Sequence, residues 1–218
     1  MKGDVVVIEA HHRQAAAEIV PDLVEVIGAC AGRFVISVAG ESGSGKSETA
    51  SAIAEELLRV AGLRSVVLGQ DDYFLLPPRS NDARRRSDPD WLGPHCEVRV
   101  DLLQANVDAA RAGADVIEKP LVDYDANAAG SETVRLEGVR VVIVEGTYVS
   151  LLRHVDYRVF IARNRQDTLA HRVKRNRGSE AADPFIEAVL GTEHKIIAGH
   201  RALADVVLTR DFDVVRQG

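Results

Sequence analysis

Short runs of apolar, largely β-branched residues alternate along the chain with segments that have helical patterns. The apolar runs are nearly continuous, as expected for strands that are buried on both faces of a parallel sheet. The predicted strands are Phe34–Val38, Ser65–Leu68, Val141–Val144, Arg158–Ile161 and Asp205–Leu208. The predicted helices are Ser47–Ala61, Val100–Ala112, Gln166–Lys174 and Pro184–Ala202. The alternation predicts an α/β fold of three layers around a parallel central sheet.

Two further segments lie outside this alternation. Residues 1–32 have the pattern of a strand followed by one or two helices, with Pro21 opening the second helix. We expect them to form an N-terminal extension that packs on a domain of residues 33–218. A small hairpin is predicted from Val116–Leu121 and Thr133–Leu136.

Composition narrows the class of protein. The chain has 218 residues, a formal net charge of −6 and only two cysteines, Cys30 and Cys96, without metal-ligand spacing. Acidic proteins of this kind are poor general binders of nucleic acid, because neutralising phosphates requires clustered Lys and Arg. The sequence contains neither a secretory signal nor an apolar stretch long enough to cross a membrane. We therefore expect a cytoplasmic protein, either monomeric or homo-oligomeric, with no nucleic-acid or membrane partner.

The decisive motif follows the first strand of the predicted domain. The pattern G-x-x-x-x-G-K-[ST] is matched in full by Gly40-Glu41-Ser42-Gly43-Ser44-Gly45-Lys46-Ser47, and a helix is predicted to follow. The glycines allow successive backbone N–H groups to surround a phosphate, and the helix N-terminus adds partial positive charge. Lys46 is expected to reach the β- and γ-phosphates of ATP, and the Ser47 hydroxyl to bind Mg²⁺. Glu48 completes the predicted cofactor-binding set.

Two acidic segments follow other predicted strands. Asp71 and Asp72 come directly after the second strand, and Glu145-Gly146 ends the buried strand Val141–Val144. The carboxyl edge of a parallel sheet is where ligands bind, so these carboxylates are candidates for work on a substrate and on Mg²⁺. Glu145 is predicted to hold Mg²⁺ beside Ser47. An acid after the second strand is predicted to accept the proton of a substrate hydroxyl and to help hold Mg²⁺.

Together these three segments resemble the uridine kinase/phosphoribulokinase-like family of P-loop kinases. The resemblance covers roughly residues 33 to 210 and includes Trp91 to Pro94 and the pair Tyr124-Asp125. It implies a γ-phosphoryl transfer from MgATP to a hydroxyl of a small molecule. It also implies that Asp71 is the base, with Asp72 as the second choice, and that Tyr73, Asp90, Trp91 and Tyr124 contact the acceptor.

The sequence departs from uridine kinases on the acceptor side alone. Those enzymes carry an acid two residues before the proline that matches Pro94, where this chain has Leu92, with Asp90 two residues earlier. They also follow the Tyr-Asp pair with a His-Ser-Arg element, where this chain has Ala126 to Gly130. Phosphoryl transfer is thus better supported than uridine or cytidine as the acceptor. Uridine, cytidine or a related nucleoside is the acceptor that the resemblance implies first, and nicotinamide riboside, pantothenate and sugars are the alternatives.

Two clusters of arginine have alternative interpretations. The first cluster runs from Arg163 to Arg177, and its simplest interpretation is the solvent-exposed face of a helix. The resemblance instead implies a helical lid whose Arg172 and Arg175 close over the phosphates. Arg84 to Arg86 lie in Pro77–Pro94, a polar, unpatterned stretch predicted to be a long loop. They are either exposed or bind an acceptor that carries a carboxylate or phosphate. A nucleotide-binding regulator without an acceptor is the alternative from another functional class.

Overall fold

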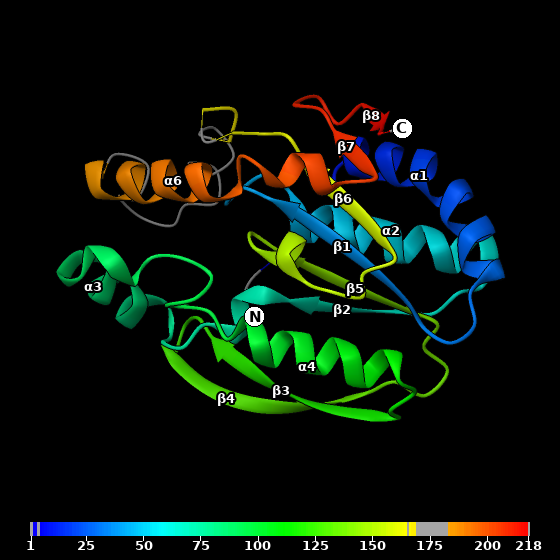
Figure 1. Cartoon of the computed structure of the whole chain (residues 1–218), viewed down its shortest axis with the longest axis horizontal. Coiled ribbons are helices and arrows are strands. Elements are labelled where there is room, and N and C mark those ends of the chain that lie inside the picture. The colour runs from blue at the N-terminus through cyan, green and yellow to red at the C-terminus, as the bar shows by residue number, and fades with distance from the viewer. Residues whose placement is uncertain (1, 4, 165, 169–182, 218) are drawn as a thin grey trace.

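The computed structural model describes residues 2–3, 5–164, 166–168 and 183–217 (Figure 1). Within them, a six-stranded sheet has the order β2-β5-β1-β6-β7-β8, and β3 and β4 form a separate hairpin. The first five strands of the sheet are parallel, and β8 is antiparallel to β7. The strands are β1 Phe34–Gly40, β2 Ser65–Gly69, β3 Val116–Asp123, β4 Ala128–Arg135, β5 Val141–Gly146, β6 Tyr157–Ile161, β7 Val206–Leu208 and β8 Val214–Arg216.

Helices cover both faces of the sheet. Figure 1 shows α1 and α2 on one face and α4 with the β3–β4 hairpin on the other, which confirms the predicted three-layer α/β fold. The α-helices are α1 Ala10–Ala29, α2 Lys46–Ala61, α3 Pro78–Ser87, α4 Val100–Arg111 and α6 Pro184–Ile197. Short 3₁₀ turns are η1 Gln70–Tyr73, η2 Pro89–Trp91, η3 Val149–Leu151 and η5 His200–Leu203.

Strand β1 separates two hydrophobic cores. All seven of its residues are buried. Because side chains alternate along a strand, Ile36 and Val38 enter the core under α1 and α2, while Val35 and Ala39 enter the core under α4. The continuous apolar run therefore reflects a central strand that is covered on both faces.

The strand order brings three chain segments to one edge of the sheet. Strand β5 lies between β2 and β1, and its Glu145 is in register with Gly69 of β2 and Val38 of β1. The three strands are parallel, so the residues that follow β1, β2 and β5 meet at their shared carboxyl edge.

Two expectations for the N-terminal segment are wrong. Residues 5–9 form no strand, and α1 is a single helix that runs through Pro21 instead of beginning a second helix there. Proline costs the helix one backbone hydrogen bond, but Ile19, Leu23 and Ile27 on both sides of Pro21 are fully buried against the domain. Burial of this continuous apolar face favours one unbroken helix.

The prediction of a loop over Pro77–Pro94 is also wrong, because this stretch contains α3 and η2. Pro78 occupies the first turn of α3, where its fixed φ suits a helix. The only buried residue of α3 is Asn81, so the helix has no apolar face that a sequence pattern could reveal.

The remaining predicted elements differ in their bounds. The hairpin is longer than expected, with Val116 opposite Arg135 and Asp123 opposite Ala128. The last helix ends at Ile197 and is followed by η5 instead of continuing to residue 202. The helix expected over Gln166–Lys174 is described only up to residue 168, so most of it lies outside the described residues, as do Arg172 and Arg175.

The placement of α1 generates a prediction about residues 1–32. The boundary at residue 32 remains a prediction, and we propose that α1 unfolds together with the rest of the chain. Ile19→Ala should lower the free energy of unfolding by about 2–5 kcal/mol, because it leaves a cavity at a fully buried site. Val26→Ala, on the exposed side of the same helix, should change it by less than about 0.5 kcal/mol. Urea unfolding checks both, and equal effects would contradict the proposal.

Candidate active site

The loop between β1 and α2 requires glycine at three positions. Gly43 and Gly45 have φ angles of +77° and +100°, a region that other residues adopt only with strain. At Gly40 a Cβ atom would lie 2.7 Å from Ser44 Oγ. The loop therefore curls tightly before the first turn of α2, as the G-x-x-x-x-G-K-[ST] pattern predicts.

Two buried hydroxyl groups, one in this loop and one in the first turn of α2, have no protein partner in the described part of the chain, as is expected where an anion binds. Ser44 Oγ and Thr49 Oγ1 are buried and have no hydrogen-bond partner among the described residues. The Lys46 ammonium donates to the Glu41 carbonyl at 3.0 Å, so a cation lies beside the loop. Together with the N-terminus of α2, these groups suit a phosphate group. Glu48, also predicted for the cofactor set, is buried in the first turn of α2.

Glu145 connects this loop to the second strand. Its carboxylate is hydrogen-bonded to Ser47, and a Cβ atom at the neighbouring Gly69 would lie only 2.9 Å from its Oε1. Burial and the charge of Asp71 raise the pKa of Glu145 to about 7, although Lys46 and Ser47 oppose the shift. The structure thus brings Ser47, Glu145, Asp71 and Lys46 together. Their predicted roles remain predictions.

The two aspartates that follow β2 differ sharply in environment. The Asp72 carboxylate is buried, accepts from the Lys119 ammonium at 2.6 Å and from the Val122 amide at 3.0 Å. Asp71 is exposed. Asp72, the second choice for the base, is therefore held in a buried ion pair, whereas Asp71 faces solvent, and which of them is the base remains a prediction.

The residues on either side of these aspartates are structural. Gln70 is buried, accepts from the Tyr148 amide at 2.7 Å and packs so closely on Gly146 that a Cβ there would lie 2.3 Å from Gln70 Cβ. Tyr73, predicted to contact the acceptor, is fully buried, and its hydroxyl accepts from Asn106. Burial raises the pKa of Tyr73 to about 12. The Tyr73 ring therefore belongs to the core, and its predicted contact with the acceptor stays a prediction.

The other predicted acceptor residues lie on α3, η2 and the hairpin. The Trp91 indole N–H donates to Asn81 Oδ1 at 2.8 Å, and Asp90 is exposed beside it on η2. Tyr124 is partly buried near the tip of the hairpin. The tip is joined to α3, because Asn127 Oδ1 accepts from the Arg79 amide at 2.8 Å.

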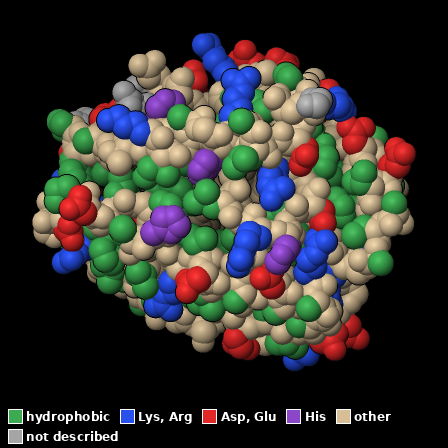
Figure 2. Space-filling model, viewed as in Figure 1, with side chains coloured by type: hydrophobic (Ala, Val, Ile, Leu, Met, Phe, Trp, Pro, Cys, Tyr) green, Lys and Arg blue, Asp and Glu red, His purple; other side chains and the backbone are tan. Residues whose placement is uncertain are grey.

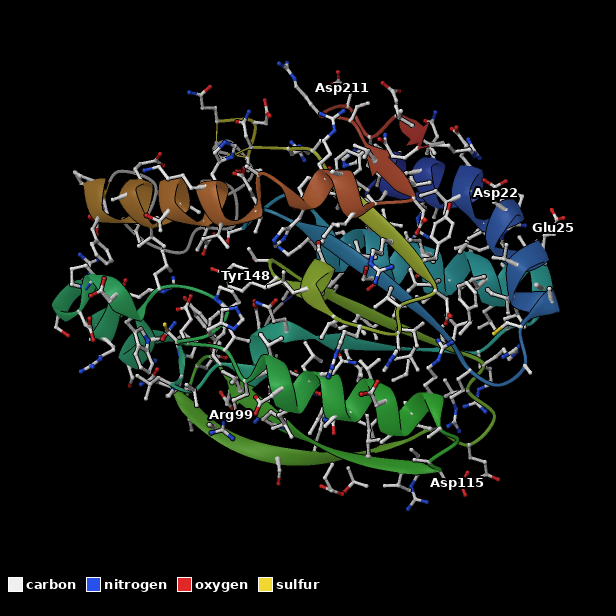
Figure 3. All side chains as sticks on the ribbon, viewed as in Figure 1. Asp22, Glu25, Arg99, Asp115, Tyr148 and Asp211 are labelled. Atoms are coloured by element: carbon white, nitrogen blue, oxygen red, sulfur yellow. The ribbon has the colours of Figure 1, made fainter. Side chains whose placement is uncertain are left out.

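An ion-pair network beside the loop was not predicted. Within Arg84–Arg86 the side chain of Arg85 is the least exposed, at 17%, and it donates to Glu97 at 2.7 Å and lies 3.7 Å from Glu193 of α6. Glu193 accepts from Ser42 of the loop at 3.0 Å, and Tyr148 lies between η3 and α6 in Figure 3. Burial raises the pKa of Glu193, with Arg85 opposing the shift. Only a tertiary contact could reveal this network, because α3 and α6 are far apart in sequence.

The ion pairs of the neighbouring arginines bear on the hypothesis that Arg84 to Arg86 bind an anionic acceptor. Arg84 pairs with Asp88, and Arg86 pairs with Asp82 and Asp183, all at partly exposed positions. Exposed basic and acidic side chains are also intermixed over the face that Figure 2 shows. Binding of an anionic acceptor by all three arginines is therefore not supported, and Arg85 alone of the three faces inward.

The raised pKa of Glu145 generates a pH prediction for the ligand-free protein. Because this pKa lies near 7 instead of 4.5, the folded protein holds an extra proton between these values. The stability that this extra proton contributes is complete below pH 4.5 and is lost as the pH rises through 7. Glu145→Gln cannot ionise, so relative to wild type it should gain on the order of 1–3 kcal/mol in unfolding free energy between pH 5 and pH 8. Urea unfolding at each pH measures this gain.

Glu25→Gln, an exposed change on α1, is the matched control and should leave the slope of stability against pH as in wild type. Parallel curves for wild type and Glu145→Gln would contradict the raised pKa.

Comparisons with known proteins agree with this geometry. The chain is 29% identical over 196 residues to the bifunctional α-galactosidase/sucrose kinase of Mediterraneibacter gnavus, covering 85% of this chain but only 21% of that protein. It is 26% identical over 186 residues to the uridine kinase of Proteus mirabilis, covering 81% and 86% of the two chains. The structure of D-glycerate 3-kinase from Cryptococcus neoformans has the same fold, with a TM-score of 0.63, 15% identity and coverage of 95% and 98%.

Among the described helices, no segment combines the length and hydrophobicity that a membrane span requires.

Residues 35–194 match the model of the Phosphoribulokinase / Uridine kinase family, which is most of the chain and includes the loop, Asp71 and Glu145. Membership of this family implies binding of ATP and a small-molecule substrate. The chain therefore belongs to the phosphoribulokinase/uridine kinase family of P-loop kinases.

Proposed function

We propose that this kinase transfers the γ-phosphoryl group of MgATP to a hydroxyl of a small polyhydroxylated molecule, with Asp71 as the general base. One observation carries the proposal: Asp71 is the exposed carboxylate beside Glu145 and the phosphate loop, while Asp72 is buried in an ion pair. A base must be accessible to the hydroxyl that it deprotonates.

The residues beside the loop fit Mg²⁺. The Ser47 hydroxyl and the Glu145 carboxylate already lie in contact, and oxygen ligands of this kind suit the ion. Among the described residues no group of three acidic, His or Cys side chains could hold a metal alone. In proteins Mg²⁺ commonly binds through one or two carboxylates plus the phosphates of its substrate. When bound, Mg²⁺ supplies charge neutralisation at the phosphates, and Asp71 is the further candidate ligand.

The chain's own residues divide the remaining tasks. Lys46 and the loop amides hold the phosphates, and Glu145 must be deprotonated to serve a cation. Asp71 accepts the proton of the acceptor hydroxyl as its oxygen attacks the γ-phosphorus, and ADP leaves on the opposite side. Arg172 and Arg175, which lie outside the described residues, are proposed to neutralise charge on the transferred group.

For the acceptor, we favour a sugar or sugar acid over uridine or cytidine. Uridine kinases use a His-Ser-Arg element after the Tyr-Asp pair, whereas here Asn127 is the only residue of Ala126 to Gly130 with a polar side chain. Its side chain is occupied by Arg79 and Ser80 of α3. Residues 126–130 therefore offer no counterpart of the His-Ser-Arg element to read a pyrimidine base.

Asp71→Asn is the sharpest test of the base. It should leave ATP binding unchanged and lower kcat at least about a hundredfold, the usual effect of removing a general base. Rapid-quench or coupled ADP assays measure kcat, and titration calorimetry measures ATP binding. Turnover near the wild-type value would refute the role of Asp71.

Asp72→Asn provides the contrast. Removing one partner of a buried ion pair is expected to lower the free energy of unfolding by about 3–5 kcal/mol. Thermal or urea unfolding detects this loss, whereas Asp71→Asn should unfold like wild type. A stable Asp72→Asn variant with a selective loss of kcat would exchange the two roles.

An acceptor panel tests the reaction class and its substrate. ADP release from MgATP is measured with uridine, cytidine, nicotinamide riboside, pantothenate, sugars and sugar acids. We expect a response to a sugar or sugar acid and none to the two pyrimidine nucleosides. A response to uridine or cytidine would overturn the sugar assignment, and slow ADP release that no acceptor accelerates would favour the nucleotide-binding regulator.

A further inference from the structure

The position of the donor nucleoside follows from the strand order and rests on the proposed function. In-line transfer places the acceptor hydroxyl and the leaving ADP on opposite sides of the transferred phosphorus. Asp71 and Glu145 lie on the β5 and β2 side of the loop that follows β1. The nucleoside of ATP must therefore extend towards β6 and β7, on the other side of β1.

A cluster of aromatic rings occupies this side. It is formed by His11 and His12 from α1 and by Phe212 from the turn between β7 and β8, whose neighbour Asp211 is labelled in Figure 3. The ring centroids of His11 and Phe212 are 4.4 Å apart, and those of His12 and Phe212 are 4.8 Å apart. At Gly45 of the loop, a Cβ atom would lie 2.9 Å from His12 Nε2 and 3.0 Å from Phe212 Cζ. The cluster therefore borders the phosphate loop directly.

Within this cluster the two histidines differ. His12 is 1% exposed, and its Nδ1 accepts from the Glu9 amide at 3.0 Å, so its Nε2 carries the proton. That N–H donates to His11 Nε2 at 3.2 Å. The His11 side chain is 36% exposed, and burial lowers its pKa. His12 thus holds the His11 ring, whose Nδ1 lies 3.7 Å from a Glu9 carboxylate oxygen, in a place where it reaches solvent.

Two further features belong to the same place. Phe212 has a φ of +68°, an unusual backbone for a bulky residue that stores local strain. The Arg163 guanidinium, directly after β6, lies 5.2 Å from the Phe212 ring centre, and its Nε is buried without a partner among the described residues. A planar, electron-rich ligand beside the cluster would stack on its rings and accept a hydrogen bond from Arg163 Nε.

We propose that His11 forms a wall of the subsite for the nucleobase of ATP, together with Phe212 and Arg163. Aromatic and guanidinium planes are the side chains on which bases stack. Both α1 and Phe212 lie outside residues 35–194, the part that matches the family model. The N-terminal segment thereby completes the nucleotide site with residues of this chain's own.

His11→Ala tests the proposal through two ligands that differ only in the nucleoside. Dissociation constants for ATP and for inorganic tripolyphosphate, each with Mg²⁺, are measured by titration calorimetry on the full chain. His11→Ala should weaken ATP binding about 5- to 20-fold, as expected for loss of one stacking partner, and leave tripolyphosphate binding within about twofold. His11→Phe, which keeps a ring, should bind ATP within about threefold of wild type. Gln14→Ala, exposed on the same helix, is the matched control.

The outcomes separate this inference from the proposed function. Unchanged ATP binding by His11→Ala would overturn the nucleobase subsite while leaving phosphoryl transfer intact. An equal loss for both ligands would also overturn it, because His11 would then support only the loop. Failure of the wild-type protein to bind either ligand would overturn the proposed function as well.

Discussion

The placement of β5 between β2 and β1 is the constraint on which the candidate site depends. It sets Glu145 next to Gly69 on one side and next to the strand that leads into the phosphate loop on the other. Glycine at position 69 leaves room for the Glu145 carboxylate, and Gly146 leaves room for Gln70. These two close contacts hold the turn that carries Asp71 against the end of β5. The proposed base and the proposed metal ligand are therefore neighbours for a packing reason.

Buried ion pairs position the acceptor side around this centre. Lys119 and the Val122 amide tie Asp72 to the hairpin, so the hairpin and Asp71 are fixed relative to each other. Arg85 ties α3 to Glu97 and approaches Glu193 of α6, and α6 in turn contacts the phosphate loop through Glu193 and His194. Burying these charges is costly without partners, so each contact specifies one arrangement of the elements. The helix that follows the expected lid segment is thus attached to the phosphate loop.

Most of the fold could be predicted from local patterns, and the failures share one cause. Strands β1 and β5 are continuous apolar runs because they are buried on both faces, and this property is visible in the sequence. Helix α3 is not visible, because Asn81 is its only buried residue and its other contacts are polar. The continuation of α1 through Pro21 is decided by burial of Ile19 and Leu23 against the domain. Local propensity alone favours a break at proline.

For the site, the sequence by itself determined the phosphate loop and the two acidic segments. The loop needs glycine at fixed positions for its φ angles and a lysine and serine at the start of a helix, and these are local requirements. Only the tertiary structure decided that Asp72 is buried in an ion pair, that the Tyr73 ring packs in the core and that Arg85 turns inward. It also placed His11 and Phe212 beside Gly45. The physical reason is that exposure and charge pairing depend on segments that are distant in sequence and meet only when the sheet has formed.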